Sequence, residues 1–243
     1  MYAQHQWSPS QAMGKNVHVW TYGHAGRPVI ALPTSGGYAH EWQQHGVIDA
    51  LADLIGHGRM RIWQPETNIV ETWNHREASL AWRMHRHAAY EQFLVSELIP
   101  HIRHVTGRSD VIVLGASVGA MYAVNCALKY PQLFPEAIGL SGRYEARTFT
   151  HGQDNTDVYY SNPLSYVWNL HGDPLQRIQR HAHVTLVCGQ GAHEKNCLKE
   201  TLHLAQGLRE KHVPLQLDVW GHDVAHEWLW WRRQIRHHLS QRV

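Results

Sequence analysis

The sequence predicts an α/β fold, with a mostly parallel central sheet, helices on both faces and a short cap-like insertion. Short β-branched apolar runs alternate with longer segments of helical period, which is typical of parallel strands joined by helices. The length of 243 residues suits one undivided domain spanning residues 1–243. With 43% hydrophobic and 17% charged residues, the composition excludes disordered and collagen-like classes.

Seven apolar runs have the length and residue types of strands. They cover residues 17–22, 28–33, 59–64, 111–116, 137–141, 184–189 and 215–220. The first two are separated only by the Gly-containing turn at residues 23–26, so we expect them to form an opening hairpin. The remaining runs are far enough apart to be joined by helices.

Three apolar stripes have the spacing of helices that cover a sheet, and a further helix is expected to begin near Val118. The stripes consist of Tyr90, Leu94, Leu98, Ile102 and Val105; of Leu198, Leu202, Ala205 and Leu208; and of Val224, Trp228, Trp231, Ile235 and Leu239. Residues 143–183 are polar and aromatic and lack a clear period over most of their length, so we interpret them as a cap-like insertion or functional loop. In this segment Tyr159, Tyr160 and Trp168 are candidates for a substrate-pocket wall.

Charge and cysteine usage limit the classes of partner and the compartment. Basic residues exceed acidic ones by two and are scattered, which argues against nucleic-acid binding. The three cysteines include no CxxC pair and favour free thiols in a reducing compartment. We find neither a signal-peptide pattern nor a run of 18 apolar residues, and therefore expect a cytoplasmic protein without a membrane span. The oligomeric state stays open, a homo-oligomer included.

The strongest motif lies at residues 115–120, where Gly-Ala-Ser-Val-Gly-Ala fits the G-x-S-x-G nucleophile elbow. The apolar strand before it and the helical pattern after it are the context that this motif requires. The turn strains the backbone of Ser117, and Gly115 and Gly119 remove side chains that would collide with the strand and helix. The competing interpretation is an ordinary strand-to-helix turn.

A serine hydroxyl needs a base and an orienting carboxylate, which in this arrangement follow in the order Ser, acid, His. We expect His222 to be the base, because it directly follows the last strand, and keep His226 as its rival, expected in the first turn of the next helix. Glu194 is the first carboxylate after the preceding strand and the favoured acid, although it also suits helix capping. Other candidate acids are Asp218, Asp223 and Asp157.

An oxyanion hole needs two backbone N–H donors. One is expected from Val118, the residue after the nucleophile, and the second from the Pro-Thr-Ser-Gly-Gly loop at residues 33–37. Ser35 and Gly36 are both candidates for the second donor.

At these residues the chain resembles the α/β-hydrolase superfamily and, within it, the bacterial "putative esterase" family related to esterase D and the mycolyltransferases. The resemblance covers nearly the whole chain and is carried by residues 22–30, 33–37, 90–94, 97–100, 115–120, 140–142 and 220–223. It implies an acyl-enzyme mechanism with Ser117 as nucleophile, His222 as base, Glu194 as acid, and the amides of Val118 and Ser35 as oxyanion hole. Val118 stands where many relatives carry a larger residue.

Two further patterns have competing interpretations. His222-Asp223-Val224-Ala225-His226 also spells H-D-x-x-H, a variant of a zinc-binding helix motif, but a strand and Gly221 precede it and we expect no metal or other cofactor. The histidine pairs 85/87, 101/104, 181/183 and 237/238 are interpreted as solvated surface. The three tryptophans Trp228, Trp230 and Trp231 are expected to anchor the last helix. Only Trp230, which lies off the apolar stripe, is also a candidate substrate platform.

We therefore expect a serine hydrolase that cleaves small-molecule carboxylic esters through an acyl-enzyme on Ser117. Two alternatives stay open: an acyltransferase with the same residues, in which an alcohol replaces water, and a catalytically inactive α/β-hydrolase that serves as a scaffold or binding module.

Overall fold

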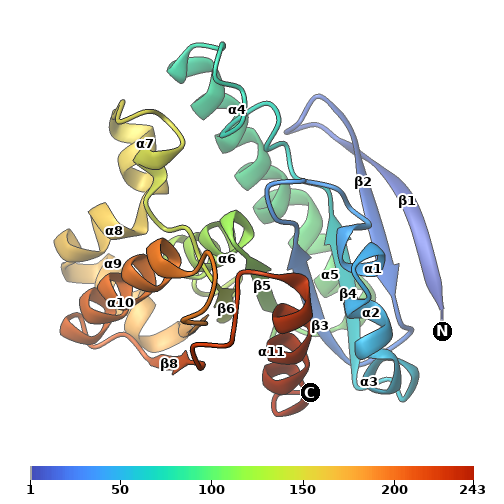
Figure 1. Cartoon of the computed structure of the whole chain (residues 1–243). Coiled ribbons are helices and arrows are strands. Elements are labelled where there is room, and N and C mark those ends of the chain that lie inside the picture. The colour runs from blue at the N-terminus through green and yellow to red at the C-terminus, as the bar shows by residue number, and fades with distance from the viewer. Residues whose placement is uncertain (1) are drawn as a thin grey trace.

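A computed structural model describes residues 2–243 and places their strands in one sheet of eight, in the order β1-β2-β4-β3-β5-β6-β7-β8 (Figure 1). Strands β3 to β8 are parallel to one another, whereas β2 runs antiparallel to both of its neighbours. The strands are β1 (Ala3–Ser10), β2 (Lys15–Tyr22), β3 (Arg27–Leu32), β4 (Met60–Pro65), β5 (Ile112–Ala116), β6 (Glu136–Leu140), β7 (His183–Cys188) and β8 (Leu215–Val219).

Helices connect the parallel strands. The longer ones are α4 (Leu80–Phe93), α5 (Ile99–Thr106), α6 (Val118–Lys129), α9 (Gly172–His181), α10 (Lys195–Glu210) and α11 (Trp228–Ser240). Of these, α5, α10 and α11 end within one or two residues of the ends of the three expected apolar stripes. The short ones are α1 (Glu41–Gln44), α2 (Val47–Ala50), α3 (Ala52–Gly56), η1 (Leu94–Leu98), η2 (Ala146–Thr148), α7 (Thr156–Ser161), α8 (Pro163–Tyr166) and η3 (Val167–Asn169). No helix of residues 2–243 is both long and apolar enough to cross a membrane.

The predicted opening hairpin is wrong, although both of its strands exist. Strand β4 lies between β2 and β3, so that Val19 of β2 pairs with Pro65 and Val29 of β3 pairs with Ile62. The hairpin partner of β2 is β1, which the sequence analysis missed. Strand β1 is a polar edge strand whose residues are mostly exposed, so it carries no apolar run that would reveal it.

Two apolar cores cover the two faces of the sheet, beneath the helices that Figure 1 shows on either side of it. Helices α1 to α3 and α11 pack on one face, with Trp42, Leu51 and Ile235 among the residues that are completely buried. Helices α4, α5, α6, α9 and α10 pack on the other, where α6 buries nearly every residue. The sheet is therefore covered on both sides, as parallel sheets generally are.

The segment between β6 and β7 is mostly helical rather than loop, since it contains η2, α7, α8, η3 and α9. It is anchored to α6 through Asn125, whose side chain donates to the carbonyl of Ser161 and accepts from the hydroxyl of Tyr166. The cap-like role of this segment stays a prediction, and so does the single-domain organisation of the chain.

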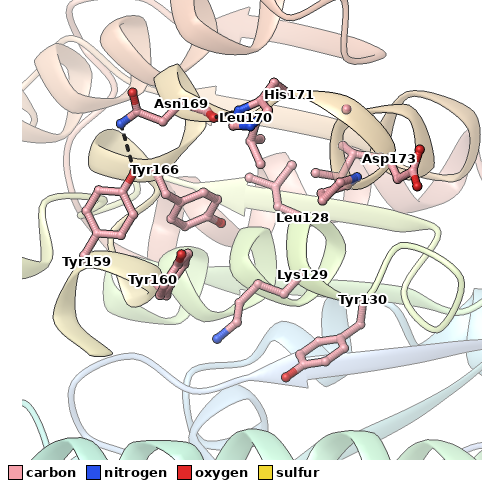
Figure 2. A pocket seen from close by; sticks show the side chains of 13 residues that line it. Leu128, Lys129, Tyr130, Tyr159, Tyr160, Tyr166, Asn169, Leu170, His171 and Asp173 are labelled. Carbon is pink, nitrogen blue, oxygen red and sulfur yellow. Dashed lines mark hydrogen bonds between the residues drawn. The ribbon is translucent and has the colours of Figure 1, made fainter. Parts of the chain in front are cut away.

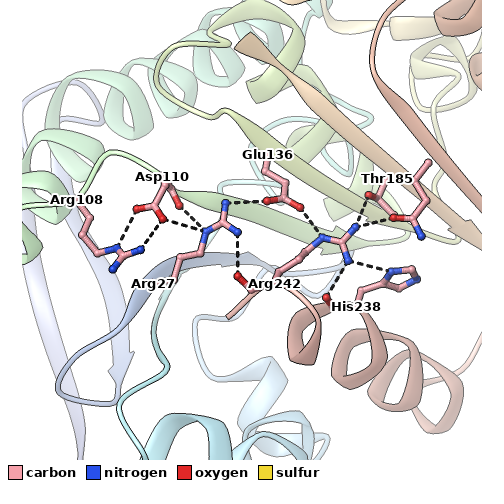
Figure 3. A network of polar contacts seen from close by, with 8 residues as sticks. Arg27, Arg108, Asp110, Glu136, Thr185, His238 and Arg242 are labelled. Carbon is pink, nitrogen blue, oxygen red and sulfur yellow. Dashed lines mark hydrogen bonds and ion pairs between the residues drawn. The ribbon is translucent and has the colours of Figure 1, made fainter.

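A network of ion pairs joins three elements at the amino end of the parallel strands (Figure 3). Glu136, at the start of β6, accepts from Arg27 at the start of β3 and from Arg242 near the C-terminus, at 2.7 and 2.5 Å. Arg242 also donates to the hydroxyl of Thr185 on β7. This end of the sheet is opposite to the carboxyl ends of the strands, where Ser117 lies.

Candidate active site

Ser117 occupies the sharp turn between β5 and α6 that its motif predicts. Its backbone has a φ of 57° and a ψ of −121°, a strained conformation for a residue other than glycine. A Cβ on Gly119 would lie 2.4 Å from the carbonyl oxygen of Pro33, and one on Gly115 would lie 2.4 Å from the backbone of Gly119. The two glycines therefore allow the strand, the turn and the helix to approach as closely as they do.

The histidine beside Ser117 is His226, and the expectation that His222 lies there is wrong. Nε2 of His226 lies 3.2 Å from the hydroxyl oxygen of Ser117. His222 is exposed in a turn after β8, and neither His222 nor Asp223 is part of a helix. The zinc-helix alternative for these histidines is therefore not formed either.

The residue at which α11 begins explains why His226, and not His222, lies beside Ser117. The helix begins at Trp228, two residues after His226, so His226 lies in the preceding loop rather than in the first helical turn. That loop pairs with residues 190–192: the amide of Gly191 donates to the carbonyl of Val224, and the amide of His226 donates to that of Ala192. A Cβ on Gly189 would lie 2.1 Å from the same carbonyl oxygen of Val224, so this glycine is required for the approach.

Glu194 lies on the other side of the His226 ring, as expected of an orienting acid. Its Oε2 is 3.5 Å from Nδ1 of His226, and its side chain is fully buried, whereas that of His226 is 20% exposed. The hydroxyl of Ser141 donates to Oε1 at 2.5 Å, and the thiol of Cys188 donates to Oε2 at 3.3 Å. Both carboxylate oxygens thus have partners in the protein interior, which offsets part of the cost of burial.

The other candidate acids lie elsewhere. Asp218 accepts from the indole N–H of Trp220 and lies 3.0 Å from Nε2 of His238. Asp223 is exposed in the turn beside His222, and Asp157 is exposed in the first turn of α7. Each is an alternative from the sequence that the geometry does not bring to His226.

The two backbone amides that the motif predicts as oxyanion-hole donors are those of Val118 and Ser35. Within residues 2–243 the amides of Val118 and Ser35 have no protein acceptor, and Ser35 lines the same cavity as Ser117. The loop of Ser35 is held by the buried carboxylate of Glu41, which accepts from the amide of Thr34 at 2.6 Å and from its hydroxyl at 2.7 Å. A Cβ on Gly36 would lie 2.7 Å from Oε1 of Glu41, so Gly36 packs against this brace.

The cavity in front of Ser117 has a volume of about 360 Å³. Its lining includes Trp228 and Trp231, which were expected to serve only as helix anchors. The ring of Trp231 packs edge-on against His226 at 4.8 Å between ring centres, and its indole N–H donates to the hydroxyl of Ser141. Trp230 is outside this lining and stacks on Arg233 instead.

The expected pocket wall of Tyr159, Tyr160 and Trp168 is wrong as a wall beside Ser117. Tyr159 and Tyr160 line a different, larger cavity of about 690 Å³ (Figure 2). That cavity adjoins Lys129 at the carboxyl end of α6, about 18 Å along the helix from its start at Ser117. Trp168 packs against His203 and is part of neither cavity lining.

Several residues of the site have no sequence motif of their own. Glu194 is contacted by Ser141 and Cys188, and the Ser35 loop is contacted by Glu41. These contacts form only because separate segments of the chain meet at the carboxyl edge of the sheet. A signal was nevertheless present for Ser141 and Cys188, since each stands at the end of a predicted parallel strand.

Two groups of side chains within residues 2–243 have the spacing of metal ligands. One consists of Glu194, Cys197 and His226, and the other of Asp218, His237 and His238.

The interpretation of the paired histidines as solvated surface is wrong for His87 and His238, which are 4% and 0% exposed. Burial lowers the pKa of each of these two imidazoles to about 4.

Comparisons with known proteins identify the family and the fold of the chain. Residues 9–241 match the model of the family described as "Putative esterase". None of the curated proteins compared with the chain matches it.

Solved structures with the same fold include a ferulic acid esterase, with a TM-score of 0.74 and 18% identity, covering 97% of this chain and 95% of its own. An S-formylglutathione hydrolase from Agrobacterium tumefaciens has a TM-score of 0.73 and 13% identity, with 98% and 92% covered. For MPT51 from Mycobacterium tuberculosis the TM-score is 0.69 and the identity 16%, with 99% and 97% covered. The family match and the α/β-hydrolase fold together place the chain in the "Putative esterase" family, as an esterase-type hydrolase.

Proposed function

We propose that the protein hydrolyses small-molecule carboxylic esters through an acyl-enzyme on Ser117, with His226 as base and Glu194 as its orienting acid. The observation that carries this proposal is the continuous contact from Ser117 Oγ to His226 Nε2 and from His226 Nδ1 to Glu194 Oε2. The assignment replaces His222 of the sequence analysis by His226 and retains the other two residues.

In the first half of the reaction, Ser117 Oγ attacks the ester carbonyl while its proton passes to Nε2 of His226. The carbonyl oxygen becomes an oxyanion, and the amides of Val118 and Ser35, which have no other protein acceptor in the described part of the chain, would donate to it. The buried carboxylate of Glu194 stabilises the imidazolium and holds Nδ1 in its protonated form. When the tetrahedral intermediate collapses, His226 returns the proton to the departing alcohol and the acyl group stays on Ser117.

In the second half, water enters the cavity and attacks the acyl carbonyl. His226 takes a proton from that water and then returns it to Ser117 Oγ, which releases the carboxylic acid and restores the enzyme. The cavity wall formed by Trp228 and Trp231 offers an apolar surface for the acyl or alcohol group.

All three cysteines are free thiols, which supports the expected cytoplasmic setting.

The test combines covalent labelling with turnover. We expect a fluorophosphonate probe to label the wild-type protein and not Ser117→Ala, and p-nitrophenyl esters of increasing chain length to be cleaved by the wild type alone. Equal labelling of Ser117→Ala would contradict the assignment of the nucleophile. Absence of both labelling and turnover in the folded wild type would favour the inactive-scaffold alternative.

A further inference from the structure

We propose that Glu194, Cys197 and His226 form an inhibitory site for a soft divalent cation such as Zn²⁺. The cation is held on the side of the His226 ring that faces away from Ser117. Its inhibitory effect rests on the proposed function, because it requires His226 to be the catalytic base, whereas cation binding itself does not.

The donor set is one that zinc prefers. A thiolate, an imidazole and a carboxylate are all common zinc ligands, and the thiolate disfavours hard ions such as Mg²⁺. Cys197 follows Glu194 by three residues at the start of α10, so both side chains lie on the same side of the helix. His226 reaches them from the loop before α11.

Two of the three distances between the ligand atoms are those expected around a tetrahedral ion. Cys197 Sγ and Glu194 Oε2 each lie 3.5 Å from His226 Nδ1, and all three ligand atoms lie within 4.8 Å of one another. Bond lengths of about 2.3 Å to sulfur and about 2.0 Å to nitrogen and oxygen, at tetrahedral angles, separate such ligand atoms by about 3.3–3.6 Å. A water molecule would complete the tetrahedron.

Without the ion, Cys197 takes no part in the proposed triad. Cys197 is 2% exposed, and its Sγ lies 3.5 Å from His226 Nδ1. When the cation binds, the thiol proton is released to solvent and a Cys197–S⁻ bond to the metal forms. The thiolate and the Glu194 carboxylate together neutralise the two positive charges of the ion.

Binding also changes the tautomer of His226, and this change causes the inhibition. The metal takes the lone pair of Nδ1, so the ring proton moves to Nε2. An Nε2–H group can donate to Ser117 Oγ but can no longer accept its proton. Of the three ligands only His226 has substantial exposure, at 20% of its side chain, so it is the ligand most accessible to solvent.

The first experiment measures binding without relying on activity. Co²⁺ is added to purified Ser117→Ala, and the thiolate-to-cobalt charge-transfer band in the near ultraviolet is recorded. We expect a saturable band of one ion per chain that disappears with EDTA and is absent from Ser117→Ala carrying Cys197→Ser. The matched control is Cys126→Ser in the same background, which removes a buried thiol on α6 and is expected to keep the band. An unchanged band in the Cys197→Ser protein, or no band in Ser117→Ala, would overturn the site.

The second experiment measures inhibition, with each variant compared with its own metal-free rate. Zn²⁺ is expected to inhibit ester hydrolysis and fluorophosphonate labelling reversibly, and Mg²⁺ at the same concentration is not. Cys197→Ser and Cys197→Ala should raise the concentration of Zn²⁺ for half-inhibition by at least about tenfold, while Cys126→Ser should not. Equal sensitivity of all variants would overturn the inhibitory role. A cobalt band in a protein whose Ser117→Ala variant stays active would instead leave the metal site standing and refute the proposed function.

Discussion

The hydroxyl of Ser141 donates a hydrogen bond to Oε1 of Glu194, and both side chains are completely buried. Ser141 has a φ of 47° at the end of β6, and its hydroxyl oxygen also accepts from the indole N–H of Trp231. The carboxylate next to His226 is therefore held by a second serine that takes no part in the chemistry.

For Ser141→Ala we expect a lower kcat and a destabilised fold. The substitution leaves a buried carboxylate oxygen without its donor, which costs about 1–3 kcal/mol in the free energy of unfolding. Urea unfolding and steady-state kinetics measure the two effects. Ser161→Ala removes another buried serine hydroxyl, away from Glu194, and serves as the control. A kcat for Ser141→Ala equal to that of Ser161→Ala would contradict a positioning role.

Substitution of the two rival histidines separates them directly. His226→Ala should lower kcat by at least about 10⁴-fold, because Ser117 then lacks its base. His222→Ala changes an exposed turn residue and should stay within about twofold of wild type. Steady-state kinetics on a p-nitrophenyl ester decides between them, and a large loss in His222→Ala alone would restore the base expected from the sequence.

Glu41→Gln tests the brace on the oxyanion loop. An amide at this position cannot accept from both donors of Thr34 as the carboxylate does, so the loop carrying Ser35 should lose its placement. We expect kcat to fall by about 10-fold to 100-fold with little change in KM, less than direct loss of an oxyanion donor costs. Glu71→Gln, which removes a carboxylate that pairs with Lys15 and Arg86 and does not contact Thr34, is the matched control. Equal kcat values for the two variants would refute the brace.

The ion-pair network in Figure 3 should matter for stability and not for catalysis. Glu136→Gln leaves Arg27 and Arg242, whose side chains are 18% and 10% exposed, without their shared carboxylate. We expect a loss of about 3 kcal/mol in the free energy of unfolding, because two largely buried cations lose their partner. Asp110→Asn, in the exposed part of the same network, should cost far less. Urea unfolding checks this order, and the reverse order would contradict it.

Acid should destabilise the fold through His87. Burial lowers the pKa of its imidazole to about 4, below the usual 6.5, so the unfolded chain binds more protons than the folded one between these values. The contribution of neutral His87 is complete above pH 6.5 and is lost as the pH falls towards 4, at up to about 1.4 kcal/mol per pH unit. His87→Phe, surrounded by the rings of Trp73 and Tyr122, should flatten this slope. Urea unfolding at several pH values measures it, and the exposed His85→Phe should leave it unchanged.

Much of the fold could be predicted because its signals are local. Each of the seven expected strands is an apolar run that forms a strand in the structure, and Ser117 lies in the turn that its glycines permit. The position of Glu194 beside a histidine also followed from its place after a parallel strand, since the carboxyl ends of such strands meet at one edge.

Contacts between distant segments escaped the sequence for a physical reason. The insertion of β4 between β2 and β3 depends on pairing energies over the whole sheet, and polar β1 has no apolar pattern to announce it. Residues such as Glu41 and Ser141 belong to no sequence motif. Their roles depend on contacts with residues that are distant in the sequence or belong to other elements of the fold.

By itself, therefore, the sequence determined the strand-turn-helix that presents Ser117, because strain, glycine and apolar period act within a few residues. Only the tertiary structure decided which of His222 and His226 lies beside Ser117. That choice depends on where α11 begins and on the pairing of the loop before it with residues 190–192, and both follow from packing between segments about 30 residues apart in the chain.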